Sequence, residues 1–283
     1  MKTYLHIVVL LSLMVVGCAR TVDDGVEEVV ATPSLLKLSA IDSLMWRQPD
    51  SALQCLLTCR DAMLASPKTP NGDSLEAHSM RAYNGHYYHL LLAELLYKNY
   101  QPQANRRELR QAVAYYDSLT LKTSHTSKPR NRHCGLNPQS PDLNDNITFL
   151  DARAHYINGV GYYEHDSIVE ACREYLTALE TMESRFGEKE LVGKKAKFMA
   201  LTHTHLTGLF SDLYLHEQAL YFGKQSLEYY QKHDATPWHI AWILNEIGSH
   251  YEMMERFDSS AFYYKKAITI LNDTSSLLYR DIV

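Results

Sequence analysis

The stretch ARAHYINGVGYYEHDSIVEACREYLTALETM, Ala152–Met182, decides how this sequence folds. Small and aromatic residues occur in it in a definite order, at Gly159, Tyr162, Ala171, Tyr175 and Ala178. Small residues allow two helix axes to approach, and a tyrosine beside them packs into the neighbouring helix. The order therefore predicts two antiparallel helices in close contact.

The same order recurs towards the C-terminus. Counted from Gly248, the same spacing finds Tyr251, Ser260, Tyr264 and Ala267, with a serine in place of one alanine. A degenerate unit lies between the two, at Leu206, Phe210 and Ala219, with small residues at Thr207, Gly223 and Ser226. Internal repetition of this kind indicates stacked units, each packed on its neighbours.

This order resembles the tetratricopeptide repeat, a pair of antiparallel helices of about 34 residues. The resemblance implies an all-α fold, a tetratricopeptide-type α-solenoid of about five antiparallel helix pairs. The alternative is an unrelated helical bundle in which the matches arise by chance.

The chain divides into regions by composition and periodicity. Residues 33–122 have helical periodicity and form a degenerate N-terminal repeat region. Residues 123–147 form a proline-rich loop, because prolines and small polar residues interrupt the pattern there. Residues 148–272 carry the repeat array, and residues 273–283 begin a terminal helix. That helix is apolar, whereas the end of a solenoid is usually polar, so we expect a partner or further chain to cover it.

The N-terminus has the pattern of an export signal in residues 1–17. Lys2 precedes the apolar run Ile7–Val16, which is too short to span a bilayer, since a span needs roughly 20 residues. Val15-Val16-Gly17-Cys18 resembles the lipobox of bacterial lipoproteins, and the resemblance implies lipid attachment at Cys18. The alternative is an ordinary signal peptide with an incidental cysteine. Residues 18–32 are polar and acidic, which predicts a flexible tether.

The mature chain looks like the envelope tetratricopeptide lipoproteins of Gram-negative bacteria. The resemblance rests on Val15–Cys18, on the segment Pro49–Leu53 and on Ala152–Met182. It implies anchorage in the cell envelope through Cys18. Ala19 stands where an aspartate usually marks inner-membrane retention, so the outer membrane is the expected location.

The remaining composition argues against several functions. A net charge of −5 at pH 7, without a dense lysine and arginine stripe, disfavours nucleic-acid binding. No phosphate-binding loop or catalytic triad motif occurs, so we expect neither an enzyme nor a cofactor. His86, His89 and Glu94 offer a weak transition-metal alternative on one helix. Surface or groove histidines are the simpler interpretation, and no metal is expected.

The resemblance places the binding surface in the groove lined by the first helix of each pair. Residues at the matching positions are Arg153, Tyr156, Tyr163, Thr204, Ser211, Trp242, Asn245 and Glu252. Aromatic anchors among polar groups are typical of recognition surfaces, although these residues could also be ordinary surface positions. We expect a scaffold that binds a protein or peptide partner. The alternative is a lipoprotein that binds a glycan or a small ligand.

Overall fold

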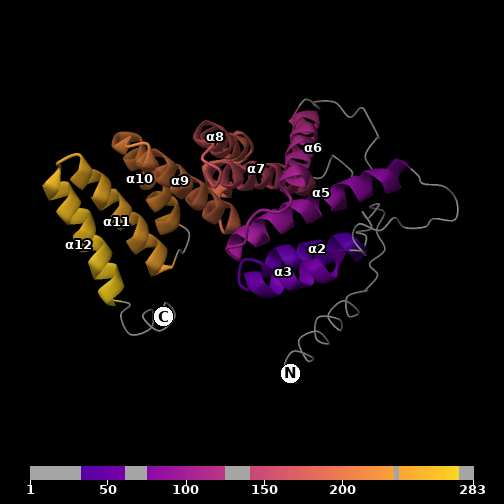
Figure 1. Cartoon of the computed structure of the whole chain (residues 1–283), viewed down its shortest axis with the longest axis horizontal. Helices are drawn as coiled ribbons and strands as arrows, with labels where there is room; N and C mark the ends of the chain where they lie inside the picture. The colour runs from indigo at the N-terminus through magenta and orange to yellow at the C-terminus, as the bar shows by residue number, and fades with distance from the viewer. Residues whose placement is uncertain (1–32, 61–74, 125–140, 233–235, 274–283) are drawn as a thin grey trace, which may run out of the picture. The chain divides into compact units, whose positions relative to one another are not determined.

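The computed structural model describes residues 33–60, 75–124, 141–232 and 236–273 (Figure 1). Its α-helices are α2 (Pro33–Leu44), α3 (Pro49–Thr58), α5 (Leu75–Lys98), α6 (Arg106–Ser124), α7 (Pro141–Tyr163), α8 (Ile168–Arg185), α9 (Lys194–Asp212), α10 (His216–Lys232), α11 (Pro237–Met253) and α12 (Phe257–Asp273). A short 3-10 helix, η1 (Glu188–Glu190), separates α8 from α9. These ranges contain no strand, so the predicted all-α class is confirmed. No helix in them is both long and apolar enough to cross a membrane.

The helices contact one another in pairs, in chain order. The pairs are α2 with α3, α5 with α6, α7 with α8, α9 with α10, and α11 with α12. Successive pairs then meet through α3 and α5, α6 and α7, α8 and α9, and α10 and α11. Each pair therefore buries its apolar faces mainly against its immediate neighbours, as in a repeat solenoid.

The same tight turn closes the first helix of several pairs. A non-glycine residue with positive φ follows that helix, at Tyr100, Asp166, Tyr214 and Glu255. The next backbone N–H donates to a carbonyl in the last helical turn: Gln101 to Leu96, Ser167 to Tyr162, Leu215 to Phe210 and Arg256 to Tyr251. Such bonds satisfy carbonyls that the helix end leaves without a partner. The repetition seen in the sequence is therefore also a repetition of backbone conformation.

The predicted contacts between small and aromatic residues are present. A Cβ added to Gly248 would lie 2.7 Å from Cδ1 of Tyr264 in the paired helix. In the degenerate unit the sizes are exchanged, since Gly223 stands in the second helix and Thr207 in the first. A Cβ on Gly223 would lie 3.6 Å from Cγ2 of Thr207. One small residue per contact is enough to let the two helices approach.

The predicted loop at residues 123–147 is too long. α7 begins at Pro141, inside the predicted loop, and α6 continues to Ser124. Proline is well tolerated in the first turn of a helix, where its missing N–H would have no helical acceptor. Pro141 therefore starts a helix instead of interrupting one. The predicted signal peptide and tether, and the terminal helix beyond Asp273, lie outside the described residues.

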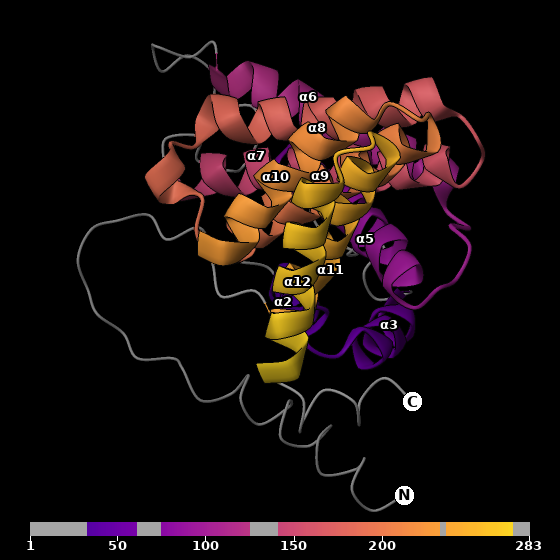
Figure 2. The ribbon, with the colours of Figure 1, turned by 90° about the vertical axis from the view of Figure 1, so that its left-hand side faces the viewer.

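The largest apolar cluster contains buried residues from every described α-helix from α2 to α9. The last pair contributes only small clusters. On α12, Phe262 is 53% exposed, Ile268 58% and Leu271 42%. In Figure 2 no other described helix lies in front of α12. The C-terminal pair therefore presents apolar side chains that the described helices do not cover.

Candidate partner-binding site

Arg153, predicted to line the groove, lies in the protein interior and is 1% exposed. Its guanidinium donates to both oxygens of Asp42 at 2.9 Å. It also donates to Glu94 at 2.9 and 2.5 Å. Although burial opposes ionisation of both carboxyl groups, Arg153 holds the pKa of Asp42 below its usual value. At Glu94 burial prevails, and its pKa is raised. The groove prediction is wrong for Arg153, which forms a buried ion network.

Tyr156 is also buried, with 7% of its surface exposed. Its ring packs edge-on against Phe198, with centroids 5.5 Å apart, and against His205, with centroids 5.1 Å apart. Burial raises the pKa of its hydroxyl well above the usual value. Tyr156 therefore belongs to the aromatic core, and the groove prediction is wrong here too.

Both corrections have the same physical cause. Asp42 comes from α2 and Glu94 from α5, and α5 packs directly on α7. In an array of equivalent pairs, the first helix of each pair lines an open groove. This face of α7, the first helix of its pair, would then be open to solvent. The N-terminal pairs cover it here, so the side chains need partners inside the protein.

Three further predicted groove residues, Tyr163, Thr204 and Ser211, are half-buried. The Tyr163 hydroxyl donates to the Asp212 carboxylate, and burial together with this bond raises its pKa to about 12. The hydroxyls of Thr204 and Ser226 lie 2.8 Å apart. Ser211 lies in the last turn of α9. A binding role for these residues stays a prediction.

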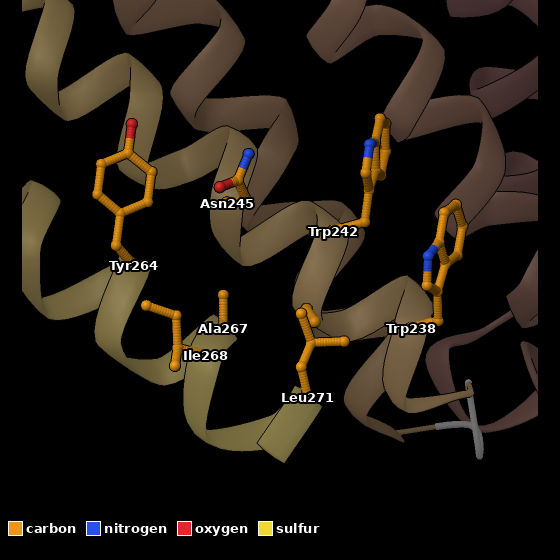
Figure 3. A pocket seen from close by; sticks show the side chains of 8 residues that line it. Trp238, Trp242, Asn245, Tyr264, Ala267, Ile268 and Leu271 are labelled. Atoms are coloured by element: carbon orange, nitrogen blue, oxygen red, sulfur yellow. The ribbon is translucent and has the colours of Figure 1, made fainter. Parts of the chain in front are cut away.

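The last three predicted residues are all on α11, and two of them, Trp242 and Asn245, line a shallow hollow between α11 and α12. The hollow has a volume of about 460 Å³ and is lined by Trp238, Ala241, Trp242, Asn245, Tyr264, Ala267, Ile268 and Leu271. In Figure 3 the indoles of Trp238 and Trp242 lie on the α11 side, and the α12 side chains lie opposite them. The indole planes are 12° apart, with ring centroids 6.5 Å apart. Trp242 and Asn245 thus line one hollow, and a binding role for them stays a prediction.

The chemistry of the hollow is mostly apolar. Asn245 supplies an amide, and the Tyr264 hydroxyl donates to Glu252 at 2.7 Å, beside the hollow. This bond engages Glu252 within the pair. Aromatic and aliphatic walls with few polar groups suit apolar side chains of a ligand, while the polar groups set its orientation.

Sequence analysis missed Trp238, which is 41% exposed and forms the outer part of the aromatic wall. It also missed the α12 side, Ile268 and Leu271. A signal was present, because Trp238 and Trp242 are one helical turn apart and share a face. The repeat pattern did not include Trp238, since it stands before the first position carried over.

The weak metal alternative on α5 does not form. Glu94 is held by Arg153, as described above, and the imidazole of His86 stacks on Tyr115 with ring centroids 4.3 Å apart. Burial lowers the pKa values of both His86 and His89. Two of these three side chains are therefore engaged in other contacts.

Solved structures resemble this arrangement of helix pairs. The chain is similar to BtubC (BKLC) from P. vanneervenii, with a TM-score of 0.51 and 12% identity over 90% of this chain and 94% of that one. Two structures of nearly identical TPR-like repeats from Podosopora anserina, one of them a point variant of the other, have TM-scores of 0.48 and 14% identity. They cover 86% of this chain and 97% and 98% of their own. No protein-family profile and no curated protein matches the sequence. The likeness concerns the fold, which is an all-helical tetratricopeptide-like solenoid.

Proposed function

We propose that this protein is a lipid-anchored scaffold of the bacterial cell envelope, and that it binds a protein or peptide partner at the hollow between α11 and α12. One observation carries the binding proposal: the stacked Trp238 and Trp242 face Ile268 and Leu271 across an open hollow. Tryptophans that remain partly exposed beside aliphatic side chains are typical of the residues that dominate binding energy at interfaces.

The composition of the hollow favours a peptide over a glycan. A sugar needs many hydrogen-bonding groups around its hydroxyls, whereas this lining offers only the Asn245 amide, the Tyr264 hydroxyl and the indole N–H groups of Trp238 and Trp242. The apolar walls suit aliphatic or aromatic side chains from a helix or an extended segment of a partner. The α-solenoid fold supports the same function, since repeat arrays present extended surfaces for other proteins.

The anchor rests on the sequence. The short apolar run before Cys18 and the lipobox-like Val15–Cys18 support export and lipid attachment. Multiple acyl chains on one cysteine give lasting attachment, whereas one chain gives marginal binding. Ala19 supports the outer membrane as the location.

The experiment is a site-specific crosslink in membranes that contain the full chain. A benzophenone amino acid replaces the exposed Asn245 in the hollow or, as the control, the exposed Glu180 on α8. We expect a discrete crosslinked protein from Asn245 and none from Glu180. Adding Trp238→Ala should strongly reduce the yield of the product, because truncation of a hot-spot residue costs roughly 2 kcal/mol of binding free energy, about a thirty-fold loss of affinity.

Two outcomes would reject the partner site. The first is an identical crosslinking pattern from both positions, and the second is a product formed in undiminished yield by the Trp238→Ala protein. If no protein crosslinks and the purified chain instead binds oligosaccharides in a Trp238-dependent manner, the glycan alternative replaces this proposal.

A further inference from the structure

A second cluster of ionisable groups lies at the junction of α6 and α7, away from the hollow. It consists of Asp117 from α6 and of Asp151 and His155 from α7. One ligand atom from each residue lies within 4.8 Å of the other two. Asp151 and His155 are one turn apart on the same helix face, and α6 packs on α7. The packing thus brings together residues that no spacing in the sequence connects.

His155 is oriented in a way that suits a metal ligand. Its Nδ1 lies 2.7 Å from Oε2 of Glu174 in α8. Its Nε2 points to the two aspartates, 3.0 Å from Oδ1 of Asp117 and 3.9 Å from Oδ1 of Asp151. A histidine that binds a metal with one nitrogen usually donates the other N–H to a carboxylate, which fixes the ring. Glu174 holds this second position.

Asp151 supplies an independent indication of a ligand. The residue is 2% exposed, and although Thr120 hydrogen-bonds to its carboxyl group, its Oδ1 atom accepts no hydrogen bond from the described residues. Burial raises the pKa of this carboxyl group to about 6. A buried carboxylate oxygen without a hydrogen bond is costly, and such groups usually have a partner, a water or an ion. This oxygen is the one that faces Nε2 of His155.

We propose that Asp117, Asp151 and His155 bind a divalent transition-metal cation of the zinc class. One imidazole nitrogen and two carboxylate oxygens are ligands that zinc accepts, at about 2.0–2.2 Å from the ion. Tetrahedral ligands at such distances are about 3.3 Å apart, close to the separation of Nε2 from the Asp117 oxygen. Nε2 and Oδ1 of Asp151 are 3.9 Å apart, so a shift of about 0.6 Å would bring these two atoms to the same separation.

The site is open on one side. The side chain of Asp117 is 47% exposed, whereas those of Asp151 and His155 are 3% and 8% exposed. The ion can therefore enter from the solvent beside Asp117, and water can complete its coordination. A bound cation would link α6 to α7, while Glu174 extends the contact to α8.

A protonated imidazole is the competing occupant of this site. Although burial lowers the pKa of His155, its hydrogen bonds to Asp117 and Glu174 raise it to about 10. Three carboxyl groups face one imidazole, so one proton leaves an excess of negative charge. A divalent cation compensates more of that charge, because it brings two positive charges in place of one.

The experiment uses metal-free protein without a histidine tag. Zn²⁺ is titrated by calorimetry, and Co²⁺ is added separately so that its visible absorption reports the ligands. We expect one Zn²⁺ per chain and an increase in melting temperature, because a ligand that binds only the folded state stabilises it. Asp117→Asn and His155→Gln should each weaken binding by more than about tenfold. Glu174→Gln should weaken it by about tenfold, as is typical for a group that orients a ligand.

The controls separate this site from adventitious binding. The double variant His86→Gln/His89→Gln should bind Zn²⁺ like the wild type. Asp117 is half-exposed, so Asp117→Asn should retain the helical circular dichroism of the metal-free protein even if a buried variant does not fold. The proposal is overturned if the wild type binds no Zn²⁺. It is also overturned if Asp117→Asn leaves both the affinity and the Co²⁺ spectrum unchanged.

Discussion

Gly159 in α7 packs directly on Tyr175 in α8: a Cβ added to Gly159 would lie 2.8 Å from Cε1 of the tyrosine ring. Real Cβ atoms do not approach so closely, and Tyr175 is fully buried, so the ring has no room to move aside. This contact is the physical reason why a glycine and a tyrosine recur at this spacing in the sequence.

Gly159→Ala should therefore destabilise the protein, by roughly 1–3 kcal/mol, through overpacking against Tyr175. Gly208, inside α9, is the matched control, because a Cβ there would meet nothing within 4 Å. Gly208→Ala should stabilise by up to about 1 kcal/mol, since alanine favours a helix over glycine. Urea denaturation of both variants checks the opposite signs, and equal effects would show that the helix contact is misplaced.

Arg153→Met should cost about 3–5 kcal/mol of unfolding free energy, because Asp42 and Glu94 would remain buried without their counter-charge. Arg256→Met is the control, since Arg256 and Glu217 form an ion pair with exposed side chains. Its loss should cost less than about 1 kcal/mol. Chemical denaturation at neutral pH measures both. A small effect at Arg153 would mean that the network does not hold α2 and α5 on α7.

His203 should make stability fall with acid. Burial lowers its pKa from 6.5 to about 4. Neither ring nitrogen has a hydrogen-bond partner among the described residues. Above pH 6.5 the histidine is neutral in both the folded and unfolded states. As the pH falls from there towards 4, only the unfolded state takes up the proton, so stability is lost.

The loss due to His203 at about pH 5 should be roughly 2 kcal/mol relative to about pH 8. His203→Phe should remove that part of the pH dependence and preserve stacking on Tyr229, whose ring centroid lies 5.6 Å away. Denaturant titrations of wild type and variant at the two pH values measure the difference. The same acid loss in both proteins would place the titrating group elsewhere.

Cys18→Ser should release the exported protein from the membrane, because a serine oxygen cannot form the thioether that carries the lipid. Partition of the variant into the aqueous phase of a detergent separation would match this expectation. Cys55→Ser is the control and should partition like the wild type, since Cys55 lies half-buried in α3. A Cys18→Ser protein that stays in the detergent phase would contradict the lipoprotein hypothesis.

The sequence by itself determined the helical class and the repeat register. These depend on short-range spacing: Gly159 meets Tyr175, and Gly248 meets Tyr264, within one helix pair joined by a tight turn. Such local order is visible in one dimension because each pair packs mainly on itself and on its neighbours.

Only the tertiary structure decided which groove positions remain open. Arg153 and Trp242 stand at equivalent repeat positions, yet α2 and α5 bury the first while the second faces an open hollow. The cluster of Asp117, Asp151 and His155 likewise exists only because α6 packs on α7. A repeat pattern specifies how a pair folds, but it does not specify which distant helix covers its face. The helix that covers a face decides whether its charged and aromatic side chains are exposed to water. A buried side chain must find its partners inside the protein, whereas an exposed one can bind a partner molecule.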